Sequence, residues 1–106
     1  MLKVVAIFGI GANAKGNIAK IFVITIGDLA HIRDHPDARQ ELNDDQLFDL
    51  IQQLLQEEPE KVVNNKSKQF VDYYYNDVEV DGHYMTVDIR ISTSTPGRII
   101  SVFERY

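Results

Sequence analysis

The sequence predicts one α+β domain in which two helices pack on one face of a mostly antiparallel β-sheet with a C-terminal three-stranded meander. The chain has 106 residues, a length that suits a single domain over 1–106. Apolar residues recur at helical spacing in the segment that follows Asn43. From Phe70 onward they alternate with polar residues, which is the period of a strand.

The N-terminal segment is expected to form two strands. Leu2–Phe8 is mostly apolar, which predicts a strand that is buried on both faces. A short secretory signal segment is the alternative interpretation of this stretch. Gly9–Gly16 is expected to be a loop or a weak helix. A stretch rich in β-branched residues, from Ala19 or Lys20 to Thr25, predicts the second strand.

A short helix is expected after this strand. Gly27-Asp28 stops the strand, and Asp28 is suited to cap a helix over Leu29–Asp34. Pro36 restricts the residue before it to extended angles, so the helix should end by Asp34 or His35.

The second helix is the strongest local signal. Asn43 is expected to cap it, because Gln46 three residues later completes a capping box. Pro59 should end it near Glu58. The apolar stripe that it is expected to bury against a sheet comprises Leu47, Leu50, Ile51, Leu54 and Leu55.

The C-terminal third is expected to be the meander. Phe70–Val80 and His83–Ser92 are joined by Asp81-Gly82, the preferred pair for a two-residue hairpin turn. Thr95–Arg98 holds a second turn, and Ile99–Glu104 is the third strand. On the middle strand, the alternation predicts a core face of Met85, Val87, Ile89 and Ile91 and an opposite face of Tyr84, Thr86, Asp88 and Arg90.

The overall charge limits the partners that are expected. The formal net charge is −5, which argues against nucleic-acid binding because phosphate contacts usually come from an excess of Lys and Arg. Most of the acidic surplus lies between residues 34 and 60, so the charge of the sheet region is closer to balanced.

The sequence contains no cysteine, so disulfides and thiolate chemistry are excluded, which fits a cytoplasmic place of action. No apolar stretch reaches the length needed to cross a bilayer, so no membrane partner is expected.

Two short motifs suggest ligand sites. Gly9–Ala14 fits a loose glycine-rich nucleotide-binding pattern, but the acidic residue and the further strands of such a fold are missing. His31 and His35 have the spacing that places two imidazoles on one helical face. Zinc could use this pair, although no third ligand is obvious. Acid–base catalysis is a better use of the two histidines. The alternative is that they lie at an exposed helix end, where His and Arg interact favourably with the negative end of the helix dipole.

Two features of the strands suit contact with a nucleic acid. Tyr73-Tyr74-Tyr75 could stack on bases, with at most two of the three on one face, although sheet packing is the commoner use of such residues. Arg90 could clamp a phosphate, or it could pair with Asp88 or with an acid on a neighbouring strand.

The order of these features resembles a known family. The strand Ile21–Thr25 leads into Asp28–Pro36, a helix ends at Glu58–Val63, and the hairpin around Asp81-Gly82 precedes a last strand, Arg98–Phe103. This order resembles the barnase–EndoU–colicin–RelE nucleases, in particular the branches associated with phages and polymorphic toxins. The resemblance covers roughly residues 20–106.

The resemblance implies a metal-independent ribonuclease toxin that needs no cofactor. Position by position, His31 and His35 fall on the helix histidines, and Ser101 falls on the hydroxyl of the closing strand. Arg90 is the best match for a basic residue on the middle strand. The 2′-hydroxyl of RNA would be the nucleophile, the histidines the base and acid, Arg90 the phosphate clamp and Ser101 a positioning donor.

Substrate and partners follow from the same resemblance. RNA, for example tRNA, is the expected substrate, and Thr86 and Tyr73 are the residues expected to contact it. An immunity protein or antitoxin is an expected partner of such a toxin. The main alternative is a non-catalytic immunity- or antitoxin-like module, whose acidic surface would suit a basic toxin. A domain that binds a small molecule between helix and sheet is a third alternative.

Overall fold

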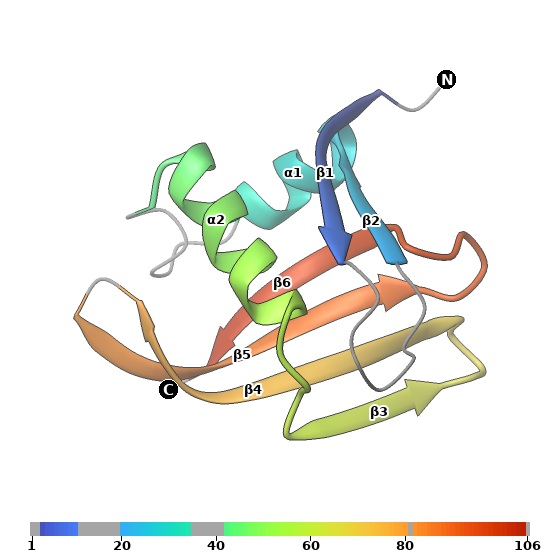
Figure 1. Cartoon of the computed structure of the whole chain (residues 1–106). Helices are drawn as coiled ribbons and strands as arrows, with labels where there is room; N and C mark the ends of the chain where they lie inside the picture. The colour runs from blue at the N-terminus through green and yellow to red at the C-terminus, as the bar shows by residue number, and fades with distance from the viewer. Residues whose placement is uncertain (1–2, 11–19, 35–41, 81, 106) are drawn as a thin grey trace.

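The chain folds as an α+β domain, which confirms the predicted class. The computed structural model describes residues 3–10, 20–34, 42–80 and 82–105. Within them, two helices and six strands follow one another (Figure 1) as β1 (Val4–Ile10), β2 (Lys20–Thr25), α1 (Ile26–Arg33), α2 (Asp44–Leu55), β3 (Lys61–Asn65), β4 (Phe70–Val80), β5 (His83–Ser92) and β6 (Ile99–Arg105).

The strands form two antiparallel sheets. A hairpin of β1 and β2 stands apart from a four-stranded sheet with the order β3-β4-β5-β6, and both helices lie on one side of that sheet (Figure 1). Strands β4, β5 and β6 are the predicted meander. The two sheets are joined where the N–H of Val23 donates to the carbonyl of Gly97 at 2.8 Å.

The first strand is buried on one face, not on both as the sequence predicts. Phe8 of β1 lies in the core, whereas the neighbouring Ile7 is 68% exposed. On β2, Phe22 points inward while Ile21 is exposed. The apolar run was misleading because β1 and β2 form a two-stranded hairpin, which packs against the core only through every second residue.

Helix α1 begins three residues earlier than predicted, because Thr25 and not Asp28 is its cap. The hydroxyl of Thr25 accepts from the N–H of Asp28 at 3.2 Å and donates to the Asp28 carboxylate at 2.8 Å. Asp28 therefore closes a capping box from the third helical position. Ile32 anchors the helix in the core, where it is fully buried.

Helix α2 begins at the predicted cap, with Asn43 and Gln46 completing the capping box. It ends at Leu55, three residues before the predicted end at Glu58. Just beyond the helix, the N–H of Glu57 donates to the carbonyl of Leu54 at 3.0 Å. The predicted apolar stripe is largely confirmed, because four of its five residues are buried, namely Leu47, Ile51, Leu54 and Leu55. The fifth, Leu50, is half-buried.

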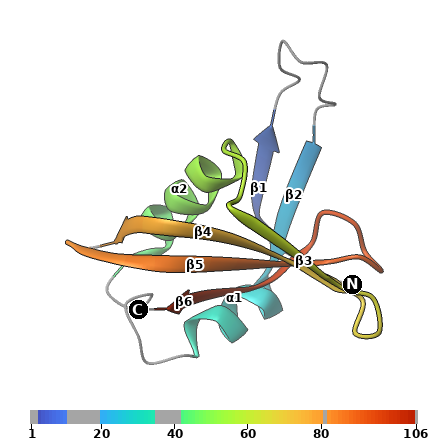
Figure 2. The same ribbon diagram turned by 90° about the horizontal axis from the view of Figure 1, so that it is seen from below.

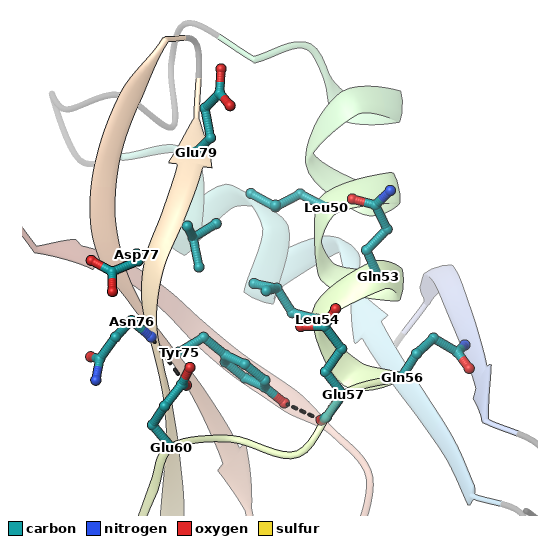
Figure 3. Close-up of a pocket in the computed structure, with 11 residues that line it drawn as sticks. Leu50, Gln53, Leu54, Gln56, Glu57, Glu60, Tyr75, Asn76, Asp77 and Glu79 are labelled. Atoms are coloured by element: carbon teal, nitrogen blue, oxygen red, sulfur yellow. Dashed lines mark hydrogen bonds between the residues drawn. The ribbon is translucent and has the colours of Figure 1, made fainter.

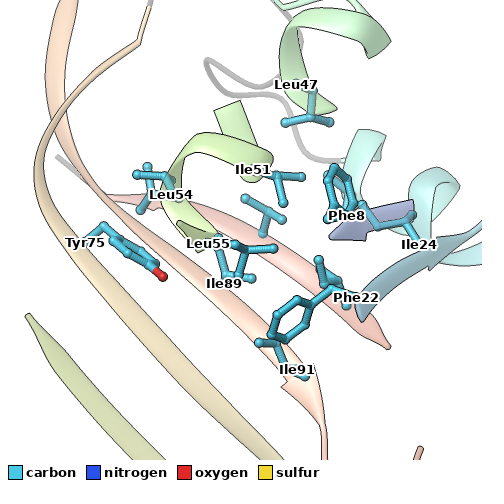
Figure 4. Packing of buried hydrophobic residues seen from close by; sticks show 14 of the residues in the cluster. Phe8, Phe22, Ile24, Leu47, Ile51, Leu54, Leu55, Tyr75, Ile89 and Ile91 are labelled. Carbon is cyan, nitrogen blue, oxygen red and sulfur yellow. The ribbon is translucent and has the colours of Figure 1, made fainter. Parts of the chain in front are cut away.

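The core lies between these helices, the hairpin and the inner face of the large sheet (Figure 4). All four predicted core residues of β5 are buried there, namely Met85, Val87, Ile89 and Ile91. On the opposite face of β5, Asp88 is also fully buried, which the alternation did not indicate.

A β-bulge in β4 sets which of its residues face the core. Val78 pairs with Met85 and Tyr75 with Val87, so the register shifts by one residue between them. Asp77, inside the bulge, has φ +54°, in the left-handed region that L-residues rarely adopt. As a result, Tyr75 points into the core.

An ion pair ties α1 to the loop before β6. Nε and Nη2 of Arg98 each donate to one carboxylate oxygen of Asp28 at 2.9 Å. Burial raises the pKa of Asp28, but the hydrogen bonds from Arg98 and Thr25 outweigh burial and leave that pKa below its ordinary value of 3.8.

This ion pair predicts a loss of stability in acid. A carboxyl with a lowered pKa in the folded state stabilises the fold above its unfolded pKa, and this contribution is lost as the pH falls through the folded pKa. We expect the melting temperature of Asp28→Asn to lie below that of the parent at neutral pH, with the gap narrowing between about pH 5 and about pH 2. Melting curves of both proteins across this range test it, and a constant gap would contradict it.

Candidate functional site

Three of the predicted site residues lie on the face of the large sheet that the helices leave uncovered, here called the helix-free face. Because Met85, Val87, Ile89 and Ile91 of β5 point into the core, the alternate residues Thr86 and Arg90 point to the other side. Ser101 of β6 pairs in register with Arg90 and shares this face. The sheet therefore brings Arg90 and Ser101 together from two strands.

Arg90 is held by an acid that the sequence analysis did not single out. Asp72 of β4 pairs in register with Arg90, and its two carboxylate oxygens accept from Nε at 2.8 Å and from Nη2 at 3.2 Å. The hydrogen bonds that Arg90 donates to Asp72 are the main cause of the raised pKa of Arg90, which therefore stays cationic. Of the two uses of Arg90 that the sequence left open, pairing with a cross-strand acid is the one observed.

The Arg90 guanidinium also lies against an aromatic ring. Its central carbon is 3.9 Å from the centroid of the Phe70 ring, a cation–π contact. A second contact of this kind joins Nζ of Lys61 to the Tyr74 ring at 5.9 Å. Two cations and two aromatic rings are thus distributed over β3, β4 and β5.

Ser101 and Thr86 differ in their surroundings. Ser101 is 2% exposed, and its hydroxyl has no hydrogen-bond partner within the described part of the chain. The hydroxyl of Thr86 donates to the side-chain oxygen of Asn76 at 3.2 Å, beside the bulge. Asp72, Arg90 and Ser101 therefore form one cross-strand row, and Thr86 lies further along β5.

The remaining predicted residues lie elsewhere. His31 is exposed on α1, in the helix layer, so the sheet separates its helix from the face that carries Arg90. Helix α1 lies beside the edge strand β6 (Figure 2). Tyr73 pairs with Ile89 and lies on the core side, whereas Tyr74 shares the face of Arg90. His35 lies outside the described residues.

A second concave site lies between α2 and β4 (Figure 3) and has a volume of about 520 Å³. Its apolar lining comes from Leu50, Leu54, Tyr75 and Val78, and its acidic lining from Glu57, Glu60, Asp77 and Glu79. We call it the acidic groove. No local sequence pattern points to this groove, because its two walls are more than a dozen residues apart in the chain.

Two hydrogen bonds shape the acidic groove. The Tyr75 hydroxyl donates to the carbonyl of Glu57 at 3.4 Å, and the N–H of Asn76 donates to the Glu60 carboxylate at 3.1 Å (Figure 3). Burial, together with the nearby Tyr73, Glu57 and Glu60, raises the pKa of Tyr75. Its phenol therefore stays protonated and keeps the proton that it donates to the Glu57 carbonyl.

In the described ranges, no group of three or more His, Asp or Glu side chains is arranged to hold a metal ion. Neither described helix is long and apolar enough to cross a membrane. No protein-family model, curated protein or solved structure matches this chain.

Proposed function

We propose that this protein is a metal-independent endoribonuclease of the toxin type that binds RNA on the helix-free face. The observation that carries the proposal is the row of Asp72, Arg90 and Ser101, in which an arginine held by a buried carboxylate stands beside a hydroxyl with unused hydrogen-bonding capacity. Cytoplasmic RNA, for example tRNA, is the substrate that the family resemblance suggests.

The chemistry of the row fits cleavage by the 2′-hydroxyl of RNA. In this reaction the 2′-oxygen attacks phosphorus and gives its proton to a base, and the 5′-oxygen leaves with a proton from an acid. The products are a 2′,3′-cyclic phosphate and a 5′-hydroxyl. Arg90 would donate hydrogen bonds to the charge that develops on the phosphorane. The Asp72 carboxylate is the group in this row that can accept a proton.

The neighbouring side chains suit single-stranded RNA. Phe70 and Tyr74 offer rings on which bases can stack, and Lys61 adds a positive charge next to Tyr74. The resemblance assigns both the base and the acid to the helix histidines. For His31 to act, RNA on the helix-free face would pass the edge of β6, beside which α1 lies (Figure 2).

The proposal predicts cleavage of RNA but not of DNA. With the purified protein and a chelator in excess, we expect tRNA and bulk RNA to be cut to fragments that end in 2′,3′-cyclic phosphate. DNA of the same sequence should stay intact because it lacks the nucleophile. Gel electrophoresis and end-group analysis provide the measurement. Activity that the chelator abolishes and zinc restores would contradict the mechanism, and intact RNA would favour the protein-binding alternative.

A further inference from the structure

Strand β4 continues well beyond its partner β3. The pairing of these two strands runs from Asn65 with Phe70 to Lys61 with Tyr74. From Tyr75 to Val80, β4 pairs with β5 on one side, and no described strand pairs with it on the other. In an antiparallel pair, alternate residues point their N–H and C=O groups away from the partner strand. The N–H of Asn76 on this edge already donates to the Glu60 carboxylate at 3.1 Å. Beyond the bulge, the N–H and C=O of Glu79 are directed outward, so Val78–Val80 is an open sheet edge.

The exposed edge borders the acidic groove. Helix α2 forms the opposite wall with Leu50, Gln53 and Leu54, which recur at the spacing of one helical face, and Glu57 follows the end of the helix (Figure 3). A strand edge that faces a helix across a groove is an arrangement to which an extended peptide can add as a further strand. Backbone hydrogen bonds would hold the peptide, and its alternate side chains would enter the groove.

The charge of the groove indicates the chemistry of its ligand. The charged residues that line it are Glu57, Glu60, Asp77 and Glu79, and all four are acidic. Between them lie the apolar side chains of Leu50, Leu54 and Val78, which are half-buried or buried. A segment that presents both basic and apolar side chains on one face of the strand would complement the charge and the apolar floor.

We propose that the acidic groove binds an extended basic segment of a protein partner, which pairs with β4 along Val78–Val80. The bulge at Asp77 limits regular pairing to these residues, because the strand is irregular between Tyr75 and Val78. This inference does not depend on RNA cleavage, since the groove and the row of Asp72, Arg90 and Ser101 share no residue.

A peptide of about eight residues with the repeat Lys-Thr-Val-Thr is a suitable probe, because it would span the edge of β4 and place lysine and valine on the same face of the strand. We expect the fluorescently labelled peptide to bind the full chain, measured by anisotropy at physiological salt. Hydrogen exchange should show new protection of the amide of Glu79, because the N–H groups of Val78 and Val80 point toward β5. The same peptide with every second amide N-methylated keeps its charge but cannot pair as a strand. It should bind roughly tenfold more weakly or worse, as expected when backbone hydrogen bonds are lost.

Variants separate strand addition from general attraction between opposite charges. Glu57→Gln together with Glu79→Gln should weaken binding of the probe by roughly tenfold. The control is Asp45→Asn together with Asp49→Asn, which removes the same charge from exposed positions on α2 that do not line the groove. Equal binding of the two peptides, equal effects of the two double variants, or unchanged exchange at the Glu79 amide would each overturn the proposal. Failure of RNA cleavage would leave it unaffected.

Discussion

Replacing Arg90 with lysine is expected to lower the rate of RNA cleavage by about 10²–10³-fold, the usual loss when one donor to a developing oxyanion is removed. Lysine keeps the positive charge but cannot reproduce a two-pronged hydrogen-bonding geometry. In the parent, the guanidinium is oriented by Asp72 through Nε and Nη2, and it lies over the Phe70 ring. A lysine ammonium would lose this orientation. The proposed function therefore predicts a loss of kcat that exceeds any change in KM.

The chain supplies a closely matched control in Arg98→Lys. Arg98 also donates through Nε and Nη2 to both oxygens of a buried aspartate, Asp28. The arginine side chains are 27% exposed for Arg90 and 29% for Arg98, and their aspartates 6% and 7%. Both variants should lose a similar amount of stability, so melting curves serve as the reference. If the two folded variants cleave RNA equally well, the assignment of Arg90 to the site is wrong.

Replacing Gly97 with alanine is expected to destabilise the fold by about 3 kcal/mol or more, from backbone strain together with a steric clash. Gly97 has φ +85°, which alanine adopts only at a cost, and an added Cβ would stand 2.5 Å from the carbonyl oxygen of Ile21. That oxygen belongs to the backbone of β2 and cannot rotate away. Any shift would also strain the hydrogen bond from Val23 to Gly97 that joins the two sheets.

Gly27→Ala is the control for this prediction. Gly27 lies in the first turn of α1, where an added Cβ meets nothing within 4 Å. Alanine should stabilise that helix by up to about 1 kcal/mol. Urea denaturation of both variants gives the two free energies of unfolding. A Gly97→Ala protein as stable as the parent would show that β2 and the loop before β6 are not packed as described.

Local sequence signals were sufficient to predict several elements of the fold. The capping box at Asn43 and the apolar stripe behind it predict α2, because a helix of this kind is specified by neighbours three and four residues apart. The turn at Asp81-Gly82 predicts the hairpin, and Gly82 has the positive φ of +81° that such a turn requires. The core face of β5 follows from simple alternation.

Strand β3 could not be predicted, because its signal is not local. Its sequence, Lys61–Asn65, does not alternate, and four of its five residues are exposed. It is a strand because its backbone pairs with β4, an interaction that depends on a partner and not on its own side chains.

The sequence by itself determined the α+β class, the long helix, the meander and the placing of Arg90 on the polar face of β5, since each depends on the period of apolar residues or on a turn. Tertiary structure alone decided which residues stand next to Arg90. If the pairing of β4 with β5 continued from the hairpin without a bulge, Asp72 would pair with Ile91. The extra residue in β4 shifts the register by one, so Asp72 pairs with Arg90 instead. The same bulge turns Tyr73 to the core side and Tyr74 to the helix-free face. The acidic groove was likewise decided by packing, because it exists only where α2 crosses the unpaired end of β4.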